Sequence, residues 1–186
     1  MYYSLLNVPI VPISLNEAKS FLRVDNTLED SVITSMIEAA VEWGEGYTNL
    51  DFRPKNWEGF FSYLCESRQE PFPYIRLAKS PVSGTPTAEI SIGGVYTANT
   101  DIIYKQYNSK SVVLFTGAAP TDSTVAYTHK ITFSSGYAAG SLPAGIRNAV
   151  LEHISFLYEN RGDAPSEPTS QIKQLYSRFR NVAGYA

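Results

Sequence analysis

Apolar residues recur at helical spacing near both ends of the chain and at alternate positions between them. Near the first end, two start signals open two helical patterns. In each, a hydroxyl residue precedes a carboxylate by three positions, as in a capping box: Ser14 with Glu17, and Thr27 with Asp30. The pattern predicts a helical hairpin with helices at 14–23 and 27–47.

The longer of these helices carries a broad apolar stripe built from i, i+4 rows, which we expect to pack against another helix. The opposite face carries three carboxylates, Glu38, Glu42 and Glu45. Such a row on one helix is usually a solvated face, and an acidic wall or a hard-cation site is the alternative.

The stretch from 51 to 137 has strand-like alternation, broken often by Gly, Pro, Ser, Thr and Asn. Gly93-Gly94 and Asn108-Ser109 are candidate hairpin turns. This part of the chain predicts a small, mostly antiparallel sheet or sandwich, with strands at 57–64, 74–77, 88–92, 102–106, 112–115 and 127–134.

Helical spacing returns after Ser141, a candidate cap, with Pro143 suited to a first helical position. We expect a helix at 142–161, a proline-containing linker at 163–168 and a short last helix at 170–181. The helices at 27–47 and 142–160 should pack together through Val32, Met36, Ile37, Ala40, Ile146, Val150, Ile154 and Leu157.

These patterns predict an α+β fold in which a core of about four helices holds an inserted antiparallel sheet or sandwich. A single domain would span 1–162, with helices at 14–48 and 142–161 and the β insertion at 51–137. Residues 163–186 would form a linker and a docking helix.

Composition adds constraints on function. The chain is 44% hydrophobic and 18% charged with a net charge of −3, which excludes a strongly basic nucleic-acid binder. Its 13 Tyr suit a contact surface, although strands also favour Tyr. Cys65 is the only cysteine, so a reducing compartment is expected. No signal peptide and no membrane-spanning stretch is recognisable.

A search for catalytic patterns finds none that is coherent. His129 lies in a strand pattern and His153 among apolar helical positions, so both are interpreted as packed side chains. Motifs such as HExxH, CxxC, GxSxG and the P-loop are missing from the sequence. We therefore expect no enzyme activity, no metal and no cofactor.

The run from Pro12 to Asn49 resembles the opening of the tailed-phage head–tail connector (adaptor) proteins, in a longer form with a strand-rich insertion. The matching residues are Leu15, Glu17, Ala18, Lys19, Leu22, Arg23, Val24, Asp25, Glu29, Asp30, Ile37, Ala39, Ala40, Tyr47 and Thr48. A second similar segment comprises Gly136-Tyr137, Leu142-Pro143, Ile146-Arg147, Ala149-Val150 and Tyr158-Glu159-Asn160-Arg161. Trp57, 72–77 and Pro81-Val82 resemble the start of the family's insertion.

This resemblance implies a structural protein at the head–tail junction of a virion, made in the cytoplasm of a bacterial host. Its partners would be the portal protein, neighbouring copies in a ring expected to be twelve-fold, and a tail or stopper protein. DNA would pass through the ring without specific binding. The sequence does not distinguish a phage from a prophage or a gene-transfer particle.

Two sets of residues become candidate sites on this interpretation. Glu38, Glu42 and Glu45 would face the channel. The last helix would dock on its own subunit, on a neighbouring subunit or on the portal, through Ile172, Lys173, Leu175, Tyr176, Arg178, Phe179 and Arg180. Competing interpretations are a Tyr-rich β-surface that binds protein or carbohydrate, and a hydrolase with an unfamiliar site.

Overall fold

The computed structural model describes residues 1–7, 10–66, 68, 70–107, 110–117, 125–162 and 167–181. The chain forms two compact units: a β unit with the described residues of 1–7 and 54–136, and a helical unit with those of 10–53 and 137–181. The predicted turn at Asn108-Ser109, most of the 163–168 linker and the last five residues lie outside the described residues.

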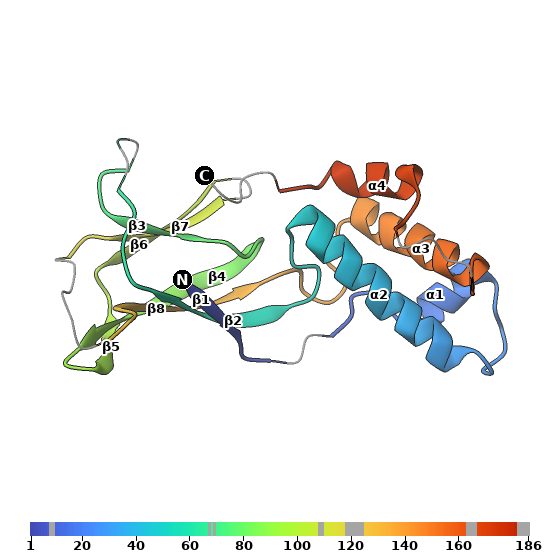
Figure 1. The fold of residues 1–186 in the computed structure, drawn as a ribbon, viewed down its shortest axis with the longest axis horizontal. Helices are drawn as coiled ribbons and strands as arrows, with labels where there is room; N and C mark the ends of the chain where they lie inside the picture. The colour runs from blue at the N-terminus through green and yellow to red at the C-terminus, as the bar shows by residue number, and fades with distance from the viewer. Residues whose placement is uncertain are drawn as a thin grey trace. The chain divides into compact units, whose positions relative to one another are not determined.

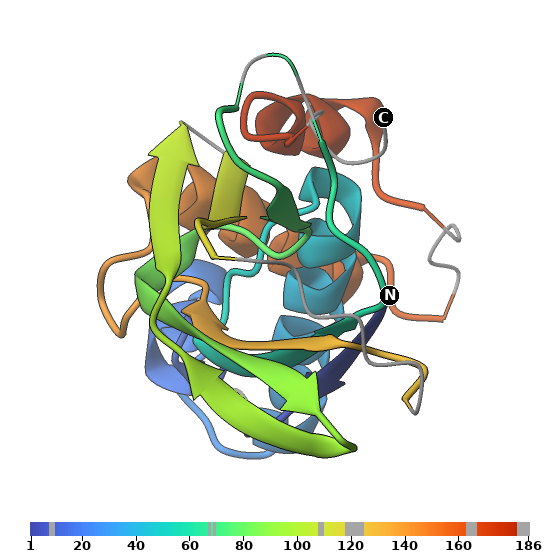
Figure 2. The same cartoon turned by 90° about the vertical axis from the view of Figure 1, so that its left-hand side faces the viewer.

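The β unit consists of two antiparallel sheets (Figures 1 and 2). The larger sheet has the order β1 (Tyr2–Leu5), β2 (Lys55–Phe61), β8 (His129–Ser135), β4 (Val82–Ile92) and β5 (Val95–Asn99). The smaller sheet has the order β3 (Tyr74–Leu77), β7 (Lys110–Phe115) and β6 (Ile102–Tyr107). Alternate residues of both sheets form one core, which includes Phe61, Ile131 and Phe133 from the larger sheet and Ile75 and Val113 from the smaller.

The hairpin predicted at Gly93-Gly94 is confirmed. Ile92 and Val95 are paired across it, and both glycines have positive φ values, 59° and 83°. Two residues in that region form the favoured turn for a two-residue hairpin. The strands β1 and β5 were not predicted, because each offers only four or five residues of alternation beside irregular sequence.

The helical unit consists of α1 (Leu15–Leu22), α2 (Asp30–Thr48), α3 (Ala144–Glu159) and α4 (Ser170–Ser177). Helices α2 and α3 lie side by side (Figure 1). Four helices and two antiparallel sheets among the described residues confirm the α+β class.

The start signals of these helices had mixed outcomes. Ser14 caps α1 as predicted, since its side chain accepts a hydrogen bond from the Glu17 N–H. Thr27 does not cap α2, which begins three residues later, because an Asn26 side chain holds the preceding turn by accepting from the Leu28 N–H at 3.1 Å. Ser141 does not cap α3 either, since its hydroxyl donates to the Ala138 carbonyl oxygen.

The predicted packing of α2 on α3 is largely confirmed. Five of the eight residues named for it are buried: Ile37, Ala40, Ile146, Val150 and Ile154. Met36 and Leu157 are partly buried against the same core. The prediction for Val32 is wrong, because this side chain is 42% exposed. The buried row of α2 runs through Ile33 and Ile37, and Val32 lies about 100° away from it around the helix.

Candidate functional site

The residues that carry the family resemblance meet in the helical unit as ion pairs. The Glu29 carboxylate at the start of α2 accepts from the Tyr158 hydroxyl at 2.5 Å and from the Arg161 guanidinium at 2.5 Å, both at the end of α3. Hydrogen bonding by Arg161 and then Tyr158 holds the Glu29 pKa below its ordinary value. Lys19 similarly pairs with Asp30 at 2.6 Å, which joins α1 to α2.

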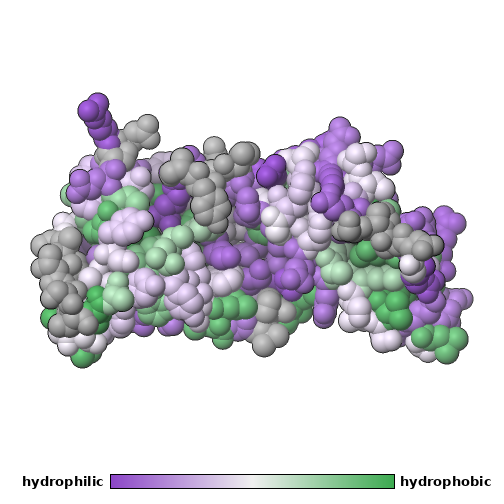
Figure 3. Space-filling view, in the orientation of Figure 1, coloured by the Kyte–Doolittle hydropathy of each residue, from purple (hydrophilic) through white to green (hydrophobic). Residues whose placement is uncertain are grey.

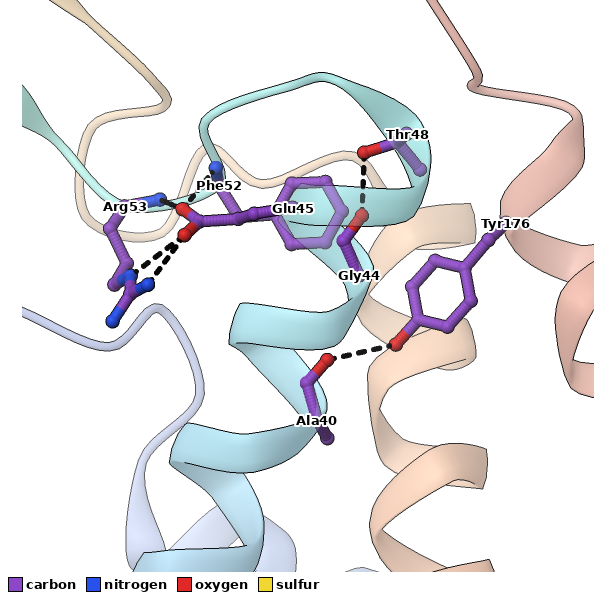
Figure 4. A network of polar contacts seen from close by, with 7 residues as sticks. All are labelled: Ala40, Gly44, Glu45, Thr48, Phe52, Arg53 and Tyr176. Carbon is purple, nitrogen blue, oxygen red and sulfur yellow. Dashed lines mark hydrogen bonds and ion pairs between the residues drawn. The ribbon is translucent and has the colours of Figure 1, made fainter. Parts of the chain in front are cut away.

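Glu45 was predicted to face the channel, but in the structure it holds a loop of its own subunit. Its carboxylate is 8% exposed and accepts from the backbone N–H groups of Phe52 and Arg53, at 2.8 and 3.0 Å (Figure 4). The Arg53 guanidinium donates to its second oxygen at 3.0 and 2.5 Å. Glu45 therefore fixes the loop after α2, and its charge is already neutralised within the subunit.

Glu38 and Glu42 remain exposed on α2, as the sequence pattern predicted. Among the described residues neither carboxylate has an ion-pair partner. The three exposed carboxylates that the sequence predicted on α2 are thus reduced to Glu38 and Glu42.

The last helix, α4, docks on its own subunit through Tyr176, which is fully buried. The Tyr176 ring lies against Gly44 of α2, where an added Cβ would stand 2.8 Å from it. The ring also stacks on Phe52, with centroids 6.3 Å apart, and its hydroxyl donates to the Ala40 carbonyl oxygen at 3.4 Å (Figure 4). Burial raises the pKa of the Tyr176 hydroxyl, which keeps it neutral.

Gly44 leaves a notch for the Tyr176 ring, and a second notch of the same kind receives Phe179. The Phe179 ring packs against Gly145 of α3, where an added Cβ would lie 2.5 Å from a ring carbon. The chain just after α4 is also held, because the Asn181 N–H donates to the Thr48 carbonyl oxygen at 2.7 Å. Ile172 is buried in the same core and Leu175 is partly buried against it. The sequence analysis did not identify either notch, because the rings that meet Gly44 and Gly145 come from a part of the chain far from both glycines in sequence.

Three cations, Lys173, Arg178 and Arg180, belong to the predicted docking residues, and the last two lie beyond α4, which ends at Ser177 rather than at 181 as predicted. Lys173 pairs with Glu167 of the same subunit, and the Arg180 guanidinium lies over the Tyr47 ring at 5.4 Å. Arg178 is exposed and has no ion-pair partner among the described residues. Of the seven residues named for an interface, the structure leaves Arg178 and Arg180 the most accessible, whereas Ile172 and Tyr176 belong to the subunit's own core.

Both histidines are packed side chains, as predicted. His153 is 3% exposed, and the Trp43 ring meets it edge to face at 5.4 Å. Burial lowers its pKa to about 4, so it is neutral near pH 7. Burial also lowers the pKa of His129 in the β unit.

A search of the described residues for three or more His, Cys, Asp or Glu side chains placed to share a metal ion found no such group. None of the described helices combines the length and apolar character that crossing a membrane requires.

Comparison with known families matches residues 12–79 to the phage gp6-like head-tail connector proteins. This range covers α1 and α2, the loop fixed by Glu45 and the first two strands that follow. The match confirms the resemblance noted from the sequence. Comparison with curated proteins gives no match.

Three solved structures share the fold over nearly the whole chain. The first is the neck of an empty gene transfer agent (GTA) particle computed with C6 symmetry, with a TM-score of 0.75 and 19% identity over 98% of this chain and 96% of that one. The virion of a native GTA particle gives 0.76 and 20% over the same shares. The neck of a native GTA particle computed with C12 symmetry gives 0.70 and 21%, over 96% of each chain.

Proposed function

We propose that copies of this protein form a ring between the portal and the tail of a phage-like particle. The protein is a structural connector of the phage gp6-like head–tail type. The observation that carries this proposal is the family match over 12–79, which contains the helical hairpin and the Lys19–Asp30 ion pair that joins its two helices. The likeness over almost the full chain to chains in the neck and in the virion of GTA particles is consistent with it.

The ring would surround the channel through which DNA passes, and twelve copies are expected. Rings of this kind need a heterologous contact, in which one surface of a copy meets a different surface of the next. The partners above and below would be the portal protein and a tail or stopper protein. The protein would be made in the cytoplasm of a bacterial host and then incorporated into the particle.

Glu38 and Glu42 are proposed to line the channel or its rim. They are exposed on one face of α2, and neither makes an ion-pair contact among the described residues. Copies of this pair around a ring would make a negative wall, and such a wall repels phosphate, because lasting contacts to the DNA backbone require Lys and Arg. DNA could then slide through without binding.

The exposed cationic surface at and just beyond the end of α4 is proposed to contact the portal or a neighbouring copy. Arg178 and Arg180 supply its charge, and the partly buried Lys173, Leu175 and Phe179 border it. Buried Ile172 and Tyr176 would hold the helix in position for this contact. A charge reversal, Arg178→Glu, should reduce attachment to portal-bearing heads, whereas Gln171→Glu, also exposed on α4, is the matched control.

The test of the function is loss of the protein from particle-producing cells. Without it, DNA-containing heads and free tails should accumulate separately, and a plasmid copy of the gene should restore joined particles. Electron microscopy of those particles should find the protein in a ring at the junction. Normal joined particles in its absence would refute the proposed function, and so would restored particles that carry it elsewhere.

A further inference from the structure

The strand β5 stands at one edge of the larger sheet, beyond β4. Natural edge strands are usually protected against pairing with other chains by charged residues, prolines or bulges. Residues 95–99 read Val-Tyr-Thr-Ala-Asn, so this edge contains neither a charge nor a proline. The register of β4 with β5 is regular from Ala88 to Ile92, so no bulge protects the edge either.

The hairpin geometry identifies the backbone groups that point away from the sheet. A two-residue turn closes with a hydrogen bond between its flanking residues, here from the Val95 N–H to the Ile92 carbonyl. Pairs in an antiparallel ladder alternate between bonded and non-bonded, so Tyr96 and Ala98 direct their N–H and C=O groups outward. Within the described residues no further backbone group takes up either of them.

The side chains on this hairpin are apolar where they are most accessible. Ile92 is 60% exposed and Val95 is 66% exposed, and they form the cross-strand pair at the turn. Figure 3 shows apolar atoms at its lower left, where Figure 1 draws this hairpin. Tyr96 is fixed, because its hydroxyl donates to the Tyr127 carbonyl at 2.9 Å and Lys130 lies 5.5 Å from its ring centre. The edge is therefore regular in register and carries no charged side chain of its own.

We infer that β5 pairs with an extended segment of a neighbouring copy of this chain, so that the larger sheet continues from one copy into the next. The inference rests on the proposed ring. A row of alternating donors and acceptors is satisfied by extended backbone, which makes the occupant a polypeptide rather than DNA. An edge of five residues is too small to hold a stable dimer alone. It suits a contact that every copy repeats around a closed ring.

The test compares two substitutions at one position in the full chain. Ala98→Pro removes the outward N–H and leaves the ladder to β4 intact, since edge strands tolerate proline on the open side. Ala98→Val keeps the N–H and is the matched control. Sedimentation over micromolar to millimolar concentrations should find association of the wild type and of Ala98→Val, weakened about tenfold or more by Ala98→Pro.

Folding of each variant is checked by thermal melting. If Ala98→Pro does not fold, the double variant Ile92→Lys and Val95→Lys decides, because both positions are exposed and the charges should prevent association. Equal association of the wild type and the deciding variant overturns the inference while leaving the proposed ring intact. A wild type that stays monomeric throughout also overturns it, whereas the proposed function is decided separately by the position of the protein in particles.

Discussion

Replacement of Tyr176 by alanine tests whether α4 is held by its own subunit. The side chain is fully buried between Gly44 and Phe52, so removing the ring leaves a cavity that these neighbours cannot readily fill. Truncation of a buried aromatic residue costs about 3–5 kcal/mol. Tyr176→Phe keeps the ring and loses only a hydroxyl whose bond to Ala40 is long, at 3.4 Å, so its cost should be about 0.5–1 kcal/mol.

Thermal and urea unfolding of the full chain measure these differences. For a unit of this size a loss of 1 kcal/mol lowers Tm by about 4–8 °C, so Tyr176→Ala should lower the transition of the helical unit by roughly 12 °C or more. Arg178→Ala, at the exposed residue that directly follows the same helix, is the control and should change the free energy of unfolding by less than about 0.5 kcal/mol.

A loss below about 1 kcal/mol for Tyr176→Ala would refute the docking of α4 on its own subunit. Deletion of residues 166–186 is a second test of the contact between α4 and its own subunit. The deletion uncovers Gly44, Phe52 and the His153 ring, so it should destabilise the helical unit in addition to removing the proposed docking surface.

Three further predictions follow from the same unit. Glu45→Ala should lower the free energy of unfolding in urea by about 2–4 kcal/mol, because it leaves two backbone N–H groups and Arg53 without their acceptor. Glu42→Ala, at an exposed position of the same helix, should change it by less than about 0.5 kcal/mol. Equal losses for the two variants would contradict the role assigned to Glu45. The His153 pKa falls from 6.5 unfolded to about 4 folded, so stability should be lost as pH drops through this window, on the order of 3 kcal/mol, and His153→Gln should flatten that dependence. Glu38→Lys with Glu42→Lys should lower DNA delivery by assembled particles without changing Tm, and unimpaired delivery would argue against a channel position.

Local signals explain what the sequence could predict. The Ser14 cap, the i, i+4 rows of α2 and α3 and the Gly-Gly turn each depend on residues a few positions apart, and each appears in the structure. The strands β3, β6 and β7 were also predicted close to their observed bounds, since alternation there is clear and turn residues bracket it.

Long-range contacts account for what it could not predict. Glu45 was placed in an acidic row by its spacing, yet its partners are a loop that the chain reaches only after the helix ends. The notches at Gly44 and Gly145 are defined by one ring on α4 and one just after it, both more than thirty residues beyond the second glycine. A glycine chosen for close approach looks, in sequence, the same as one that merely weakens a helix.

The motif residues shared with connector proteins are themselves largely structural. Glu29, Tyr158 and Arg161 lock the start of α2 to the end of α3, and Lys19 with Asp30 locks α1 to α2. Such a signature can identify the fold while containing none of the contacts to other proteins. Those contacts must use surfaces that the signature leaves open, and we propose for them the cationic surface at and beyond the end of α4 and the uncharged edge of β5. Substitutions at these two surfaces should alter assembly while leaving folding intact, whereas substitutions in the motif should lower the stability of the helical unit itself.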